Sequence, residues 1–246
     1  MTTLIVGGGW SGLAAAVRLS QQGHKVHLFE SARQLGGRAR SVDWQGLAVD
    51  NGQHLMIGAY RQTLSLLNDI GADNARLFHR LPLNIDIHDP DYPSLRIAAG
   101  FGLPWPFSLA WRLWRDNDGS CLAQISRINL LARRFQAAQD ISVASWLTQA
   151  GQSHRLVRQL WEPLCLATLN TPIKEASAAV FARVLSTTFR ARPDTDLLIP
   201  RLPLGETLPR LAEQYIRQHG GQIDLQSRVE NIEIEAGRVT GLVTQT

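Results

Sequence analysis

The chain has 246 residues, enough for one large domain or two of modest size. Hydrophobic residues make up 44% and charged residues 19%, a globular composition that excludes disordered, collagen-like and coiled-coil chains. The formal net charge of +4 is mild and the basic residues are not concentrated into a stripe of the kind that binds nucleic acids, so nucleic-acid binding is not expected.

The N-terminal residues predict a strand, a helix and a second strand. The apolar run Thr2–Val6 has the composition of a buried parallel strand. Helical periodicity begins at Gly12 and stops at Gly23, which stands where a glycine commonly ends a helix. Lys25–Glu30 is a second strand that completes a β-α-β unit. The helix face expected to be buried consists of Leu13, Ala16, Val17 and Ser20.

A loop, a strand pair and a helix follow. Ser31–Arg40 is expected to be a loop, and residues 39–50 to form short strands around a turn at Gln45-Gly46. Tyr60–Ile70 is predicted to be a helix that ends at Gly71. The residues expected to face inward from this helix are Leu64, Leu67 and Ile70.

The rest of the chain is predicted to be helical in its middle and mixed at its end. Further strands are expected at 84–87 and 94–98, and a mostly helical block at 104–189 with breaks at 116–119, 151 and 170–172. Extended chain at 197–203, a helix at 208–216 and two strands at 222–229 and 232–243 complete the prediction.

This interrupted order predicts an α/β protein: a Rossmann-like sheet domain, with a β-meander, that carries a mostly helical insertion. We expect residues 1–75 and 204–246 to form the nucleotide-binding domain and residues 76–203 to form a substrate domain.

Gly7, Gly9 and Gly12 form the pattern G-x-G-x-x-G at the end of the first strand. Gly7 permits a sharp turn, Gly9 lets a pyrophosphate lie against the backbone, and Gly12 lets the helix pack close to the strand. The helix N-terminus then offers N–H groups and partial positive charge to phosphates. The motif alone is also compatible with a tight turn that binds nothing.

Glu30 ends the second strand, where its carboxylate can accept both hydroxyls of an adenosine ribose. This context predicts a dinucleotide site and argues against the 2′-phosphate of NADP. A second glycine pair, Gly36-Gly37, follows with Arg38 and Arg40. NAD needs no second point of backbone approach there, whereas FAD has a second half to hold. The alternative is a solvent loop with ordinary arginines.

These motifs, "GGGWSGLAAA…E…LGGRARS", resemble the FAD-binding start of the amine oxidase and phytoene desaturase superfamily. The resemblance implies that Gly36, Gly37 and Arg38 lie along the FAD pyrophosphate and the flavin edge. "VDNGQHLMIGAYR" and "WEPLCLATLNTP" resemble the bacterial squalene-associated desaturases, which are hydroxysqualene dehydroxylases of the hopanoid pathway. The resemblance covers essentially the whole chain. It implies FAD as cofactor and the reductive dehydroxylation of hydroxysqualene, with hydride from reduced flavin.

Other activities remain open on the same scaffold. A carotenoid (phytoene-type) desaturase or a flavin amine oxidase would share these motifs. Rab GDP-dissociation inhibitors, which bind prenyl lipids without a flavin, also resemble this fold, although the intact glycine motifs and Glu30 argue against a non-catalytic protein. Family members are longer than this chain, so we expect it to be an N-terminal portion whose exposed half-core favours oligomers.

The segment Asp50–His54 offers further candidates. Gly52 would let the backbone approach the flavin, and His54 is a candidate proton donor, with an ordinary internal hydrogen bond as the alternative. No residue is assigned as the acid that assists departure of the hydroxyl group.

The segment Phe101–Asp116 suits a membrane interface because tryptophans and arginines alternate in it. An isoprenoid substrate resides in the bilayer, so this segment is a candidate doorway; a core-facing helix is the alternative. Cys121 and Cys165 lack metal-site spacing and are expected to be buried thiols. Without a signal peptide or a spanning apolar stretch, the chain is expected to be cytoplasmic, with peripheral contact at the inner face of the membrane.

Overall fold

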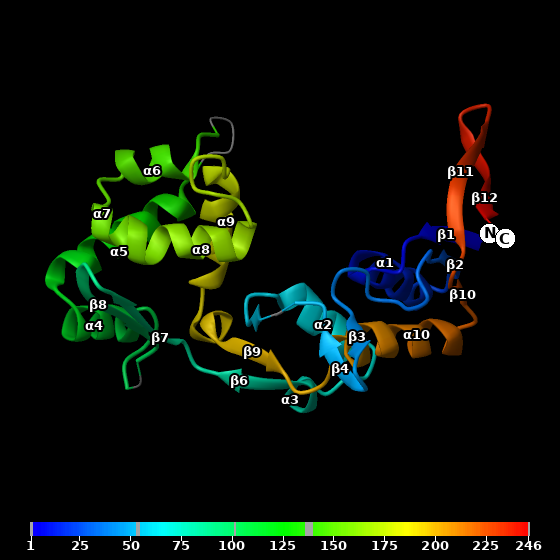
Figure 1. Cartoon of the computed structure of the whole chain (residues 1–246), viewed down its shortest axis with the longest axis horizontal. Coiled ribbons are helices and arrows are strands. Elements are labelled where there is room, and N and C mark those ends of the chain that lie inside the picture. The colour runs from blue at the N-terminus through cyan, green and yellow to red at the C-terminus, as the bar shows by residue number, and fades with distance from the viewer. Residues whose placement is uncertain (1, 53–54, 101, 136–139, 246) are drawn as a thin grey trace. The chain divides into compact units, whose positions relative to one another are not determined.

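The computed structural model describes residues 2–52, 55–100, 102–135 and 140–245. The chain divides into two compact units (Figure 1). Unit 1 comprises Met1–Leu55, Arg61–His79 and Leu198–Thr246, and unit 2 comprises Met56–Tyr60 and Arg80–Leu197. The domain boundaries expected after residues 75 and 203 stay a prediction.

A parallel sheet with the strand order β1-β2-β10 forms the centre of unit 1. Its strands are β1 (Thr2–Val6), β2 (Lys25–Phe29) and β10 (Gln222–Asp224). Two helices in contact with each other pack on it, α1 (Trp10–Gln21) and α10 (Leu208–Gln218). The core between these elements is apolar and includes Leu13, Val17, Leu28, Ala212 and Ile216. The predicted β-α-β unit is therefore present, and the α/β fold class is confirmed.

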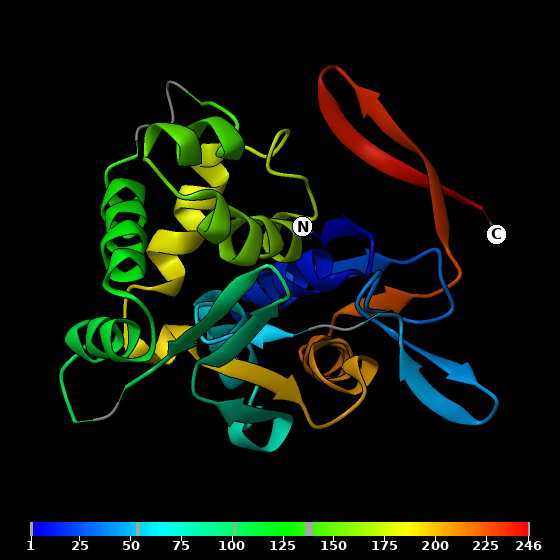
Figure 2. The same ribbon diagram turned by 60° about the vertical axis from the view of Figure 1, so that its left-hand side comes forward.

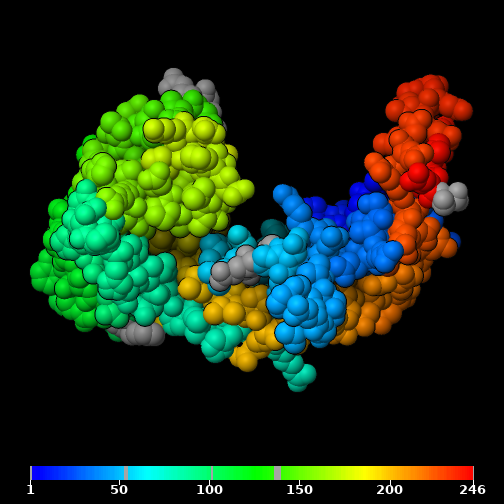
Figure 3. Space-filling model, viewed as in Figure 1, coloured from blue at the N-terminus to red at the C-terminus, as the bar shows by residue number. Residues whose placement is uncertain are grey.

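Two antiparallel hairpins belong to unit 1. One joins β3 (Ser41–Trp44) to β4 (Leu47–Asp50), and the other joins β11 (Arg228–Glu235) to β12 (Arg238–Gln245). The β11–β12 hairpin stands off the rest of unit 1 in the space-filling view (Figure 3). Accordingly, several of its apolar side chains, including Ile234 and Val239, are exposed.

Shorter elements complete the connections. They are α2 (Arg61–Asp69), α3 (Asn74–Leu77), the 3-10 turns η3 (Arg192–Thr195) and η4 (Leu204–Glu206), and the strands β5 (Met56–Ile57), β6 (Phe78–Leu81) and β9 (Leu197–Pro200), in the order β5-β9-β6. The sequence did not predict α3, whose N-terminus is capped by Asp73 through Ala75 N–H at 2.9 Å.

Unit 2 combines one hairpin with a set of helices (Figure 2). Its elements are β7 (Asn84–Asp89), β8 (Tyr92–Ala98), α4 (Phe107–Asp116), α5 (Gly119–Arg133), α6 (Val143–Gln149), α7 (His154–Leu156), the π-helical turn η2 (Val157–Trp161), α8 (Glu162–Leu169) and α9 (Ala178–Thr188). The helices bury Trp161 and Phe181 completely, together with the thiols Cys121 and Cys165. Side-chain caps begin several helices; Ser142, for example, accepts a hydrogen bond from Ser145 N–H at the start of α6.

Three sequence predictions needed correction. Helix α1 begins at Trp10 rather than Gly12 because Gly9 already serves as its N-cap. Helix α2 buries Leu66 as well as Leu67, and Leu64 and Ile70 are only half-buried. The strand predicted over 222–229 is interrupted. At the interruption Gln226 adopts a positive φ, and its N–H donates to the carbonyl of Ala32 at 3.0 Å, so the chain turns onto the loop after β2.

Candidate functional site

The turn between β1 and α1 begins with backbone contacts between glycines and their neighbours. Gly7 has a φ of +98°, a conformation that favours glycine, and its N–H donates to the carbonyl of Phe29 at 2.8 Å. Gly9 is the N-cap of α1, and its carbonyl accepts the first helical hydrogen bond, from Leu13 N–H at 2.9 Å. The first N–H groups of α1 have no partner within a helix, so this end can bind an anion.

Close packing requires glycine at position 12 and crowds Gly8, where the flexible end of the Leu35 side chain would have to move. A Cβ atom at Gly12 would lie 1.9 Å from the carbonyl oxygen of Gly7, so any side chain would push α1 away from the turn. A Cβ atom at Gly8 would lie 2.4 Å from Cδ2 of Leu35. The sequence motif explains Gly12 but not Gly8, because the contact of Gly8 involves the loop after the next strand.

Glu30 is nearly buried and is held by three donors. Its Oε2 accepts a hydrogen bond from Gly8 N–H at 2.6 Å. Its Oε1 accepts from Ala32 N–H at 2.8 Å and from the Ser31 hydroxyl at 3.2 Å. The carboxylate therefore locks the glycine turn to the end of β2. Oε2, which has this single protein donor among the described residues, keeps a lone pair for a further donor.

The second glycine pair lies against the first motif. Gly36 and Gly37 have φ values of +111° and +61°. Gly36 N–H donates to the carbonyl of Gly8 at 2.9 Å, and Gly36 forms an isolated parallel bridge with Gly9. A Cβ atom at Gly37 would lie 3.1 Å from Cα of Gly9. The structure thus brings together two motifs that the sequence presented separately. We call these two segments, residues 7–12 and 36–37, the glycine cradle.

The chain at residues 50–52 lies beside the arginines that follow the cradle. Asn51 N–H donates to the carbonyl of Arg40 at 2.9 Å, and Gly52 has a φ of +103°. The side chain of Arg38 is exposed. The Nε of Arg40 is buried and has no hydrogen-bond partner among the described residues, which makes Arg40 a candidate that the sequence did not rank. His54, the candidate proton donor, lies outside the described residues.

Comparison with known proteins assigns the chain to a family. A family model of flavin containing amine oxidoreductases matches residues 10–246. The chain belongs to this family. The resemblance to the amine oxidase and phytoene desaturase superfamily is thereby confirmed.

Two curated relatives resemble nearly the whole of this family member. A hydroxysqualene dehydroxylase from Zymomonas mobilis is 27% identical over 98% of this chain and 57% of its own length. A zeta-carotene desaturase from Synechocystis is 26% identical over 99% of this chain and 53% of its own length. The chain therefore spans little more than half the length of these relatives.

Solved structures share the fold. An oxidoreductase from Methanosarcina mazei has a TM-score of 0.75 at 18% identity, covering 99% of this chain and 56% of that protein. A Rab GDI from Plasmodium falciparum has a TM-score of 0.55 at 11% identity, covering 98% of this chain and 61% of that protein. At these identities the likeness concerns the fold alone.

Family membership supports the predicted cofactor, FAD, and the cradle fits it. Gly12 and Gly37 let the two segments of the cradle pack closely, whereas a Cβ atom at Gly7 would meet nothing within 4 Å, so bare backbone is left open at the end of β1. The helix N-terminus and the unsatisfied Nε of Arg40 suit the two negative charges of a pyrophosphate.

Metal and thiol chemistry receive no support from the described residues. No group of three or more histidine, cysteine and acidic side chains is placed to hold a metal ion within the part of the chain that the structure describes. Burial is the main cause that raises the pKa values of the Cys121 and Cys165 thiols, which disfavours the reactive thiolate. None of the described helices is long and apolar enough to cross a bilayer.

Proposed function

We propose that this chain is the FAD-binding part of an oxidoreductase that acts on an isoprenoid lipid and converts hydroxysqualene to squalene in hopanoid biosynthesis. The observation that carries the proposal is the contact between Gly8 and Gly36, which joins both cofactor motifs in one cradle. The substrate is inferred from the hydroxysqualene dehydroxylase that the chain resembles from end to end.

In this proposal the glycine cradle and the residues beside it each have a role in holding FAD. Gly7, Gly9 and Gly12 would admit the pyrophosphate to the N–H groups of α1. Glu30 would accept a ribose hydroxyl through the lone pair left on its Oε2. Gly36, Gly37, Arg38 and Gly52 would lie along the rest of the cofactor.

Reductive dehydroxylation breaks a carbon–oxygen bond and forms a carbon–hydrogen bond. Bound in its reduced form, FAD would supply the hydride. The hydroxyl group takes up a proton and leaves as water, which balances the reaction. In this reaction the chain would bind and orient the cofactor through the glycine cradle. No described residue is assigned as the proton donor.

A visible absorption spectrum of the 246-residue chain tests the cofactor site. After incubation with FAD and gel filtration, we expect flavin bands to stay with the protein. Anaerobic incubation of the reduced complex with hydroxysqualene should then yield squalene, detected by mass spectrometry. A colourless protein, even after incubation with excess FAD, would contradict the proposed cofactor role of this chain.

A carotenoid desaturase is the second candidate, because the zeta-carotene desaturase is nearly as similar as the dehydroxylase. It would remove hydrogen from its substrate and reduce FAD, the opposite direction of electron flow. Bleaching of the oxidised flavin by a carotene, without reoxidation of the reduced flavin by hydroxysqualene, would favour it. An amine that bleaches the flavin would favour an amine oxidase. A prenyl-lipid carrier would bind lipid without retaining flavin, so the protein would be colourless.

We also propose that unit 2 contacts the membrane through α4. Phe107, Trp111 and Trp114 recur at helical spacing on one face, which we call the aromatic face of α4. They are 66%, 48% and 54% exposed. The rings of Trp111 and Trp114 lie 5.1 Å apart, centroid to centroid, so they form one apolar surface. Aromatic side chains of this kind favour the headgroup level of a bilayer. Phe101, at the start of the predicted segment, lies outside the described residues.

Flotation with neutral phosphatidylcholine vesicles tests this contact. Replacing both tryptophans with glutamate, Trp111→Glu with Trp114→Glu, should abolish co-flotation. Trp44→Glu, on the β3–β4 hairpin of unit 1, is the matched control because Trp44 is 59% exposed. The contact is wrong if the double variant floats as well as the unchanged chain.

A further inference from the structure

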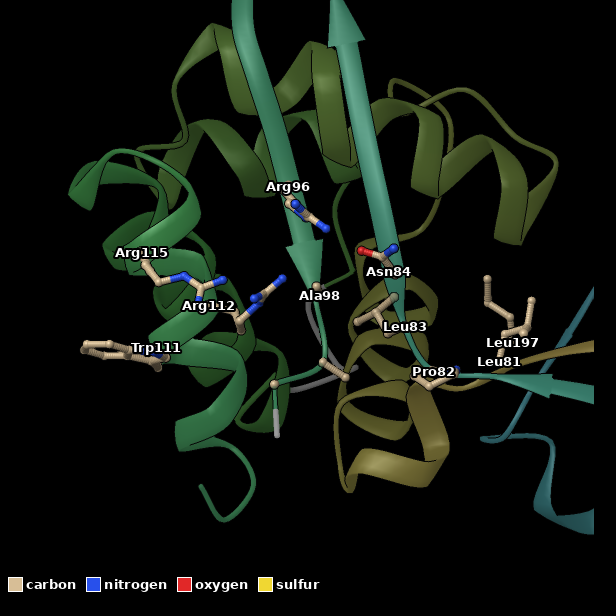
Figure 4. Close-up of a pocket in the computed structure, with 12 residues that line it drawn as sticks. Leu81, Pro82, Leu83, Asn84, Arg96, Ala98, Trp111, Arg112, Arg115 and Leu197 are labelled. Atoms are coloured by element: carbon tan, nitrogen blue, oxygen red, sulfur yellow. The ribbon is translucent and has the colours of Figure 1, made fainter. Parts of the chain in front are cut away.

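Unit 2 contains a pocket of about 650 Å³ beside α4 (Figure 4). Arg96 of β8 and Arg112 and Arg115 of α4 contribute guanidinium groups to its lining, and Asn84 of β7 contributes an amide. In the close-up, the side chains of Arg96 and Arg112 project into the same space between the hairpin and α4. Gly100 permits this close packing, because a Cβ atom there would lie 2.6 Å from the carbonyl oxygen of Ser108.

The pocket carries more positive than negative charge. Arg96 pairs with Asp86 at 3.3 Å, while Arg112 and Arg115 share Asp116 at 3.1 Å and 2.7 Å. The hydrogen bond from Arg115 is the main cause that lowers the pKa of Asp116, so this carboxylate is ionised at neutral pH. Three guanidinium groups thus face two carboxylates. One positive charge remains, which equals the charge of one phosphodiester in magnitude.

Among the described residues, Arg112 keeps free hydrogen-bond donors although it is paired with Asp116. Its Nε lies 3.1 Å from Oδ2 of Asp116, yet neither atom makes a hydrogen bond of acceptable geometry with any described residue. The side chain of Arg112 is 22% exposed, so this donor is largely removed from water. Nε itself is closed off beside Asp116, and it is the end of the guanidinium group, which projects into the pocket, that can donate to a phosphate oxygen.

The position of the pocket favours a lipid headgroup over a free anion. Trp111 belongs both to the lining of the pocket and to the exposed aromatic face. Phe107, also on that face, lines an apolar groove of about 390 Å³ between α4 and α5. Helix α4 therefore carries cationic side chains, aromatic rings and an apolar groove next to one another. In a bilayer these would match the lipid phosphate, the interface and the acyl chains, respectively.

We propose that Arg96, Arg112 and Arg115 form a binding pocket for the phosphate of an anionic phospholipid headgroup. This inference rests on the proposed membrane contact of α4. It adds a preference for lipid charge, which the aromatic face does not provide by itself.

Flotation of the 246-residue chain with two kinds of vesicle tests the pocket. One kind is phosphatidylcholine alone, and the other also contains phosphatidylglycerol. We expect tighter binding to the anionic vesicles. The double variant Arg96→Gln with Arg115→Gln should weaken anionic-vesicle binding about 30-fold and leave neutral-vesicle binding unchanged. If circular dichroism shows that it is unfolded, Arg115→Gln alone should weaken binding about 5-fold.

The control removes the same number of charges elsewhere. Arg76→Gln with Arg238→Gln changes two exposed arginines of unit 1, and it should weaken anionic-vesicle binding far less. Equal losses of anionic-vesicle binding in both double variants would overturn the proposed pocket, since the net charge of the chain would then explain the binding. Calorimetric titration with inorganic phosphate should show weak binding; tight binding of free phosphate, without preference for anionic vesicles, would also overturn it. Loss of neutral-vesicle binding reports on the aromatic face, and loss of flavin reports on the cradle, so the three failures are distinguishable.

Discussion

In the glycine cradle of unit 1, backbone atoms approach one another so closely that side chains are excluded, whereas the aromatic face of unit 2 consists of large side chains that few neighbours cover. The Cα of Gly9 would lie 3.1 Å from a Cβ at Gly37, while Phe107 is 66% exposed. The comparison shows that the cradle depends on the absence of side chains, whereas the aromatic face depends on the presence of large ones. Added side chains should therefore damage the cradle, and truncated side chains should damage the aromatic face.

An added side chain in the cradle should have the largest effect on stability. Gly12→Val places its Cβ atom 1.9 Å from the Gly7 carbonyl oxygen, so α1 must shift. We expect a loss of about 3 kcal/mol in the free energy of unfolding and loss of FAD retention. Urea unfolding and the flavin spectrum measure the two effects. Gly119→Ala, in open space at the start of α5, is the control and should stabilise by up to about 1 kcal/mol. Similar stability in both variants would contradict the packing argument.

Removal of the carboxylate that holds the cradle should have the next largest effect. Glu30→Gln replaces a carboxylate oxygen with an NH2 group, which leaves Gly8 N–H or Ala32 N–H without its acceptor. We expect a destabilisation of about 2 kcal/mol, measured by urea unfolding, and weaker FAD binding. The exposed Glu235→Gln should change neither quantity. Unchanged stability of Glu30→Gln would mean that the lock on the glycine turn is not required.

A smaller effect on stability is expected at the N-terminus of α5 in unit 2. Asp118 caps α5, and its pKa is lowered to about 2, chiefly by the hydrogen bond from Ser120 and then by Arg155. A lowered pKa in the folded state stabilises the protein above the unfolded value, and this stabilisation is lost as the pH falls toward 2. Asp118→Asn should therefore lower Tm slightly near pH 7. The loss in the free energy of unfolding should be less than about 1 kcal/mol, because the carboxylate is half-exposed. Thermal unfolding at several pH values should show this difference vanish near pH 2; a constant difference would exclude the charge as its cause.

The smallest effect on stability should come from the aromatic face. Phe107→Ser should change the free energy of unfolding by no more than about 0.5 kcal/mol, because the ring is mostly exposed. Neutral-vesicle binding should nevertheless weaken severalfold. Leu47→Ser, at a 62% exposed position in unit 1, is the matched control for flotation and should have no effect on it. A large loss of stability in Phe107→Ser would mean that this side chain packs within unit 2.

Much of the local structure could be predicted because it depends on neighbouring residues. The β-α-β unit, the glycine at the end of α1 and the serine cap of α6 follow from periodicity and backbone sterics within a few residues. The break at Gln226 could not be predicted, since its cause is a hydrogen bond to Ala32. Burial in α2 was partly misjudged because the pattern of Leu64, Leu66 and Leu67 fits more than one inward face.

The amino-acid sequence by itself predicted where unit 1 would bind a dinucleotide, because glycine spacing and the acid after the second strand are local properties. Only the tertiary structure decided that Gly36 bonds to Gly8, and that Glu30 holds the turn through Gly8 N–H. It also brought Arg96 of β8 to the same pocket as Arg112 of α4. These contacts join elements that are far apart in the chain, and packing of their apolar faces, rather than any local pattern, sets which polar groups meet.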